Sequence, residues 1–117
     1  MDKKILEIQP LEDTTIIRLL PDRVYQDVVP EFREQIIALL DQGHDRIVFD
    51  LSKVEVMNSS GLGILILIQD SLERKKGCMV LSGLSPVLRQ LFSQMKLETL
   101  FKVTKSENEA LELIKTL

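Results

Sequence analysis

The sequence predicts an α/β protein in which helices pack against a β-sheet. Short β-favouring segments alternate with longer amphipathic segments from residue 46 to the end, in the order β-α-β-α-β-α. The 117 residues, with 44% hydrophobic content, suffice for one hydrophobic core. Because no repeat, linker or low-complexity segment interrupts the chain, we expect one domain over residues 1–117.

Two strands are predicted near the start of the chain, over Lys4–Ile8 and Thr14–Leu20. A turn-like segment, Pro10–Asp13, separates them, and the second begins with two threonines and two isoleucines, which favour strands.

A helix is predicted over about residues 26–40. Its apolar residues recur at steps of three and four, which places them on one helix face. They are Val29, Phe32, Ile36, Leu39 and Leu40. Pro30 fits only in a first turn, so the helix should begin near residues 28–29, with Asp27 as its N-cap and Gly43 as its end.

The middle of the chain contains a buried strand, predicted at Arg46–Leu51, and an ambiguous segment from Asn58 to Gly77. Within that segment Ile64–Ile68 alone would fit a strand, but the strongly helical residues after it favour one long helix. A helix on a sheet buries one stripe, so five consecutive apolar residues must point partly elsewhere.

The last part of the chain predicts two further strand–helix pairs. A strand at Cys78–Leu81 precedes a helix that begins at Ser85 and Pro86. A short strand at Phe101–Val103 precedes a last helix, which starts at Ser106 with Glu109 at capping-box spacing.

Composition and charge exclude several classes of protein. Fifteen basic and eighteen acidic residues give a net charge of −3, with one short basic cluster at 74–76, which argues against direct nucleic-acid binding. The longest apolar stretch, 61–68, is too short to span a bilayer, and no signal peptide is visible. Cys78 is the only cysteine, so a reducing cytosol is the natural setting and we expect a cytoplasmic protein.

The residues of catalytic and metal sites are nearly absent. A serine hydrolase would have to combine the only histidine, His44, with Ser59 or Ser60, and the Gly-x-Ser-x-Gly elbow is missing. One cysteine and one histidine cannot build a zinc site, and no phosphate-binding loop is present. We therefore expect no enzyme, no cofactor and no metal.

The pair Ser59 and Ser60, between a buried strand and a helix, is the one feature with a chemical meaning. Asn58 or a serine can cap the helix, and Gly61 and Gly63 allow close packing. Capping alone does not explain two adjacent hydroxyls where a phosphoryl group would meet backbone N–H donors. A phosphate there would add about −1.5 to −2 charges to a contact surface.

Residues 50–63, Asp-Leu-Ser-Lys-Val-Glu-Val-Met-Asn-Ser-Ser-Gly-Leu-Gly, resemble the signature of STAS-domain anti-sigma factor antagonists. The usual form is Asp-Leu-Ser-x-Val-x-(aromatic)-Met-Asp-Ser-Ser-Gly-Leu-Gly. Residues 84–92 are similar to a later helix of that family, and Leu97 and Phe101 fit the leucine and the phenylalanine-containing short strand expected after that helix. The likeness covers nearly the whole chain.

The resemblance implies a mixed sheet of about four to five strands covered by about four helices. It implies a partner, an anti-sigma factor with serine kinase activity, which the unmodified antagonist binds so that a sigma factor is released. Phosphorylation of Ser59 would end that binding, and a serine phosphatase would restore it. The resemblance leaves a monomer or a weak dimer open.

We expect the partner surface to lie around the start of the helix and the turn near Tyr25. It is predicted from Tyr25, Asn58, Ser59, Ser60, Gly61 and Leu62.

Two departures from the family pattern bear on this function. Asn58 stands where the family has aspartate, and Tyr25 stands about where the aspartate of a Gly-x-Leu-Asp turn is expected. If the missing acid at position 58 orients the serine for the kinase or phosphatase, phosphorylation is weakened or lost. The alternative is then a STAS adaptor or scaffold that works without phosphorylation, in a stress-sensing or transporter-associated complex.

Overall fold

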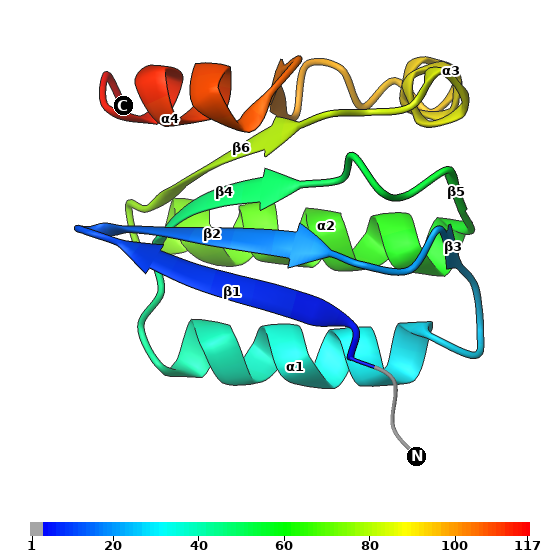
Figure 1. Ribbon diagram of the computed structural model, residues 1–117, viewed down its shortest axis with the longest axis horizontal. Helices are drawn as coiled ribbons and strands as arrows, with labels where there is room; N and C mark the ends of the chain where they lie inside the picture. Colours follow the sequence, from blue (N-terminus) through cyan, green and yellow to red (C-terminus); the bar gives the residue numbers. More distant parts are fainter. Residues whose placement is uncertain (1–3) are drawn as a thin grey trace.

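The computed structural model describes residues 4–117 and contains a five-stranded mixed sheet with four helices (Figure 1). The strand order is β1-β2-β4-β6-β7, with β1 antiparallel to β2 and every other pair parallel. The sheet strands are β1 (Leu6–Leu11), β2 (Thr14–Leu19), β4 (Arg46–Asp50), β6 (Cys78–Ser82) and β7 (Lys102–Thr104). The helices are α1 (Val29–Asp41), α2 (Ser59–Arg74), α3 (Pro86–Gln94) and α4 (Glu107–Ile114). The predicted α/β class and mixed sheet are confirmed.

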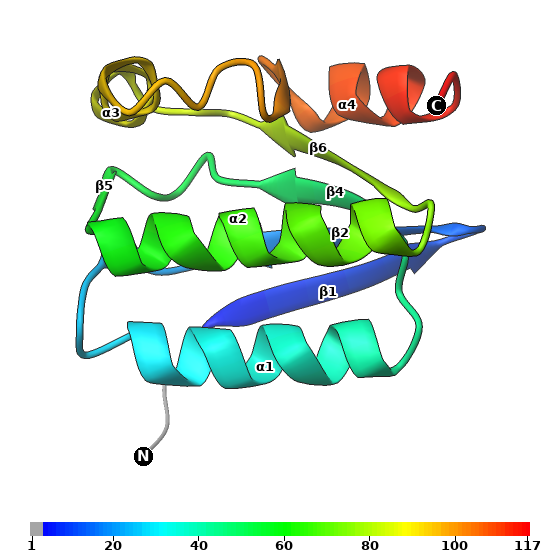
Figure 2. The same ribbon diagram turned by 180° about the vertical axis from the view of Figure 1, so that it is seen from behind.

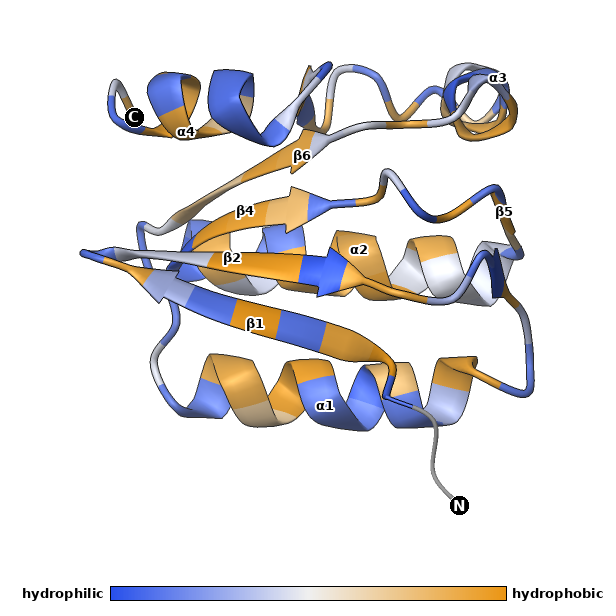
Figure 3. Ribbon diagram, viewed as in Figure 1, coloured by the Kyte–Doolittle hydropathy of each residue, from blue (hydrophilic) through white to orange (hydrophobic). Residues whose placement is uncertain are grey.

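Helices cover both faces of the sheet. The main core contains residues of α1, α2 and α3, whereas α4 packs with Ile16, Val48 and Val80 on the other face. The central strand β4 is therefore buried on both faces, with Phe49 in the main core and Val48 opposite it. In Figure 3 the edge strand β1 instead alternates hydrophobic and hydrophilic residues, as expected for a strand with one face in solvent.

The predicted first strand and turn are partly wrong. β1 continues to Leu11 through Pro10, and the turn consists of Glu12 and Asp13 alone. Proline is tolerated because β1 is an edge strand, where one side of the backbone has no ladder partner. Glu12 makes the tight turn with a φ of 58°.

Helix α1 begins at Val29 as predicted, but Asp27 is not its cap. Val28 occupies the N-cap position without a side-chain hydrogen bond. The backbone carbonyl of Tyr25 accepts from the N–H groups of Val28 and Val29, each at 2.9 Å, and so satisfies them instead. Gly43 comes after the helix end with a φ of 91°, which confirms its predicted role.

The ambiguous middle segment forms one helix, as its length predicted. Ile64, Leu65 and Ile68 are fully buried, whereas Ile66 and Leu67 are half-buried on the outer side of α2. No helix within residues 4–117 is long and apolar enough to cross a membrane.

Candidate functional site

Three segments meet at the start of α2: the turn at 22–28, the loop at 51–57 and the first turn of the helix. The two-residue strands β3 (Arg23–Val24) and β5 (Val56–Met57) pair in parallel there, at one end of the molecule (Figure 1). The N–H of Glu55 donates to the carbonyl of Asp22 at 2.8 Å, and the N–H of Asn58 donates to that of Val24 at 3.0 Å. These backbone bonds hold the turn against the helix start.

Asn58 is the N-cap of α2. Its Oδ1 accepts from the N–H of Gly61 at 2.9 Å, which is the bond that an aspartate would also make. Its Nδ2 donates to Oε1 of Gln26 at 3.4 Å, a donation that an ionised aspartate cannot make. The asparagine therefore preserves the cap and adds a contact to the turn that carries Tyr25.

Ser59 and Ser60 are the first two residues of α2, and both are exposed. The side chain of Asn58 caps the N–H of Gly61, so the two serines lie at the start of a well-defined helix rather than on a loose loop. Their hydroxyls are accessible to another protein.

Gly61 and Leu62 lie beneath this surface, which corrects the prediction that they contact a partner. Leu62 is 0% exposed and belongs to the main core. A Cβ on Gly61 would lie 3.1 Å from Cγ1 of Val24 and 3.4 Å from Cβ of Met57. Gly61 thus permits the close packing of α2 on β3 and β5, and Leu62 anchors the helix from below.

Tyr25 is half-buried beside the site. The guanidinium of Arg23 lies 5.0 Å from the centre of its ring, within the range of a cation–π contact. The ring borders a hollow that is also lined by Asp27, Val28 and Glu31 at the start of α1. Within the turn at 22–28 the hydrogen-bond partners of Asn58 are Val24 and Gln26, which flank Tyr25 in the sequence, so Tyr25 forms the flank of the surface.

Asp50 and Ser52 secure the loop that leads to the serines. The carboxylate of Asp50 accepts from the N–H of Ser52 at 3.1 Å, from Oγ of Ser52 at 3.0 Å and from Oγ of Ser82 at 3.3 Å. On the other side of the loop, Oγ of Ser85 donates to the carbonyl of Glu55 at 2.9 Å. The two sequence motifs, 50–63 and 84–92, therefore contact each other through the loop.

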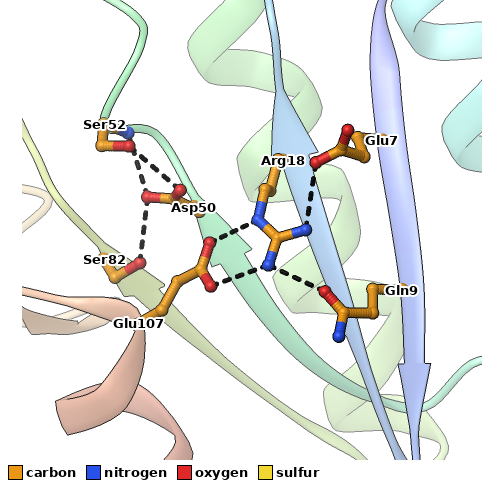
Figure 4. A network of polar contacts seen from close by, with 7 residues as sticks. All are labelled: Glu7, Gln9, Arg18, Asp50, Ser52, Ser82 and Glu107. Atoms are coloured by element: carbon orange, nitrogen blue, oxygen red, sulfur yellow. Dashed lines mark hydrogen bonds and ion pairs between the residues drawn. The ribbon is translucent and has the colours of Figure 1, made fainter.

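A polar network behind Asp50 reaches four other elements (Figure 4). Arg18 on β2 donates to both carboxylate oxygens of Glu107, at 2.6 and 2.9 Å. It also donates to Glu7 at 3.1 Å and to Gln9 at 2.9 Å on β1. Sequence reasoning missed this network because bonded members such as Arg18 and Glu107 are 89 positions apart and no spacing rule connects them.

Two carboxyl groups of the network, those of Asp50 and Glu107, have pKa values shifted in opposite directions. Burial, followed by the neighbouring Glu107 carboxylate, raises the pKa of Asp50. The hydrogen bond from Arg18 lowers the pKa of Glu107. Asp50 thus opposes folding when ionised, whereas Glu107 stabilises the fold when ionised.

We expect Asp50→Asn to change how stability depends on pH. Asp50 contributes most to stability below its ordinary pKa of 3.8, and this contribution is lost as the pH rises through the raised value in the folded protein. Asparagine does not titrate, so the variant should gain stability relative to wild type between pH 4 and neutral pH. Urea unfolding at several pH values measures this, and a constant difference across the range would contradict the assignment.

The histidine and the serines that a serine hydrolase would have to combine lie far apart in the structure. The loop from α1 to β4, which contains His44, lies at the end of the sheet opposite the start of α2 (Figure 1). The Nδ1 atom of His44 lies 2.8 Å from Oγ1 of Thr15. His44 and Ser59 cannot form a catalytic pair. Within residues 4–117 no three potential ligand residues cluster to hold a metal ion.

The fold and the site define a small α/β domain with an exposed pair of serines at a helix start. The STAS domain family model matches residues 6–110, and the chain belongs to this family. Among curated proteins it is similar to the "Putative anti-sigma factor antagonist BtrV" of Bordetella bronchiseptica. The two are 28% identical over 104 residues, which is 89% of this chain and 90% of the relative.

Solved structures show the same fold. Protein TM1081 of Thermotoga maritima has a TM-score of 0.86 at 22% identity, over 94% of both chains. The anti-sigma factor antagonist SpoIIAA in its unphosphorylated form has a TM-score of 0.79 at 24% identity, over 96% of this chain and 97% of that one. SpoIIAA of Bacillus is also known in a phosphorylated form, with a TM-score of 0.72 at 24% identity over 93% of this chain and 98% of that one.

Proposed function

We propose that this protein is a phosphorylation-controlled anti-sigma factor antagonist of the bacterial cytoplasm. It binds an anti-sigma factor that is also a serine kinase, releases a sigma factor, and is switched off by phosphorylation of Ser59. The observation that carries the proposal is the exposed Ser59–Ser60 pair at a rigidly capped helix start. Membership of the STAS family and likeness to a protein solved in both phosphorylation states support it.

In this proposal the protein is a switch and not an enzyme. The unmodified surface consists of Ser59, Ser60 and Asn58, with Tyr25 at its flank. A phosphate at the first residue of α2 lies near backbone N–H donors and the positive end of the helix dipole, so the fold tolerates it. The same phosphate adds charge to a surface that must lose water when the partner docks, and so it opposes binding.

The first test is the intact mass of the protein from its native host under growth and stress conditions. We expect one added phosphoryl group on wild type, none on Ser59→Ala, and one on the control Ser60→Ala, because the family motif places the modification on the first serine. A phosphoryl group that persists in Ser59→Ala and disappears in Ser60→Ala would move the site by one residue and overturn the assignment.

The second candidate is an adaptor that is never phosphorylated, and Asn58 favours it. An asparagine caps α2 without placing a carboxylate beside the serine. If no condition yields a phosphorylated form while a partner still co-purifies, the adaptor is the better description. The variant Asn58→Asp then tests whether the missing carboxylate prevents phosphorylation, because phosphorylation by the kinase should return in it.

A further inference from the structure

The outer side of α2 continues the serine surface along the helix. Ser59, Gly63, Ile66 and Asp70 succeed one another at steps of four, three and four residues, which places them on one face. This face points away from the sheet, because Leu65, Ile68 and Leu72 on the opposite side are fully buried. Figure 2 views the molecule from this side, with α1 lying alongside α2.

Packing against the rest of the described residues does not require a glycine at position 63. A Cβ at this position would meet no atom of the described residues within 4 Å. In contrast, a Cβ on Gly77 would clash with the backbone carbonyl oxygen of Asp45. Glycine is less favourable than alanine inside a helix, so Gly63 weakens α2 without improving its packing. Close approach of another chain accounts for a glycine in open space.

The surface next to Gly63 has an apolar centre with polar and charged residues around it. Gly63 borders a hollow lined by Ile66, Leu67 and Leu100 and, around them, by Gln69, Asp70 and Glu73 of α2 and Arg33 of α1. Leu67 and Arg33 also line a second hollow between α1 and α2, where Ile37 is 42% exposed. Apolar side chains flanked by charged ones therefore run from Gly63 to the groove between the two helices.

We propose that a helix of the anti-sigma factor crosses α2 at Gly63 and packs apolar side chains on Ile66 and Leu67. Continuity with the serine surface selects this occupant, because Ser59 and Gly63 are one helical turn, about 6 Å, apart on the same face. A partner that covers the Ser59 hydroxyl reaches Gly63 directly. The absence of a side chain there lets the two helix axes approach more closely than usual. This inference rests on the proposed function.

The test compares Gly63→Ala and Gly63→Leu with wild type and with Ala38→Leu, which adds similar bulk at an exposed position of α1. The binding probe is the purified anti-sigma factor, identified by mass spectrometry after co-purification from the host. We expect Gly63→Ala to raise the melting temperature by about 3 °C, since alanine favours the helix and meets no obstacle. We expect Gly63→Leu to remain folded and to bind at least about tenfold more weakly, while Ala38→Leu binds normally.

Three outcomes would overturn the inference. The first is unchanged affinity of Gly63→Leu while Ser59 phosphorylation still abolishes binding, which would leave the proposed function intact. The second is a drop in melting temperature for Gly63→Ala, which would mean that the fold itself requires glycine. The third is a wild-type dimer in sedimentation that Gly63→Leu dissociates, which would make a second copy the occupant. Failure of wild type to bind any anti-sigma factor would instead contradict the proposed function.

Discussion

Replacing Leu62 with alanine is expected to lower the free energy of unfolding by about 3 kcal/mol. Leu62 is fully buried under the first turn of α2, and truncating it leaves a cavity among close-packed neighbours. Urea unfolding measures the loss as a lower midpoint at an unchanged slope. Where the variant is still folded, its affinity for the partner should stay near that of wild type, because the side chain faces the core.

Leu67→Ala is the matched control for that experiment. The same side chain is removed from the same helix, but Leu67 is half-buried on the outer face. We expect a stability loss of no more than about 1 kcal/mol together with weaker partner binding. If Leu62→Ala instead left stability unchanged and impaired binding, Leu62 would belong to the contact surface after all.

These two leucines show how far the sequence alone could locate the site. The motif at 50–63 located the start of α2 correctly, and the two serines are exposed there. It could not say which side of the helix Leu62 occupies, because Ile64–Ile68 is apolar on every side and blurs the helical period. Burial in the main core distinguishes Leu62 from Leu67, and that information is tertiary.

The errors in the secondary structure have a similar cause. Asp27 has a favourable cap side chain. However, the carbonyl of Tyr25 accepts hydrogen bonds from the N–H groups at the helix start, so the Asp27 side chain does not bind them. Strands β3 and β5 have two residues each, too few for a periodic pattern. By contrast, Gly43 and the cap at Ser106 were predicted because each acts through its immediate neighbours.

The roles of Asp50 and Ser52 in the motif also became clear only from the structure. Their mutual hydrogen bonds shape the loop before the serines, and Ser82 joins them from β6. The first residues of the motif are therefore structural, and the exposed serines near its end are the ones that we propose to contact the partner. One continuous sequence motif thus contains residues that shape the loop and residues that form the proposed contact surface.

Ser59→Asp should weaken binding to the anti-sigma factor by about 2 kcal/mol, or about 30-fold in Kd. The added charge must lose water on docking and lies on an exposed residue in the middle of the proposed surface. The fold should not suffer, because an acidic residue in a first helical turn interacts favourably with the helix dipole. Isothermal titration calorimetry and thermal melting, measured on the same samples, separate the two effects.

Ser59→Asn is the control, since it has nearly the same shape as aspartate without the charge. Only if Ser59→Asp binds much more weakly than Ser59→Asn, at an equal or higher melting temperature, is charge the cause. Equal binding by both variants and wild type would remove the electrostatic basis of the switch. The site would then act through shape alone, and the adaptor that Asn58 favours would become the better account of this protein.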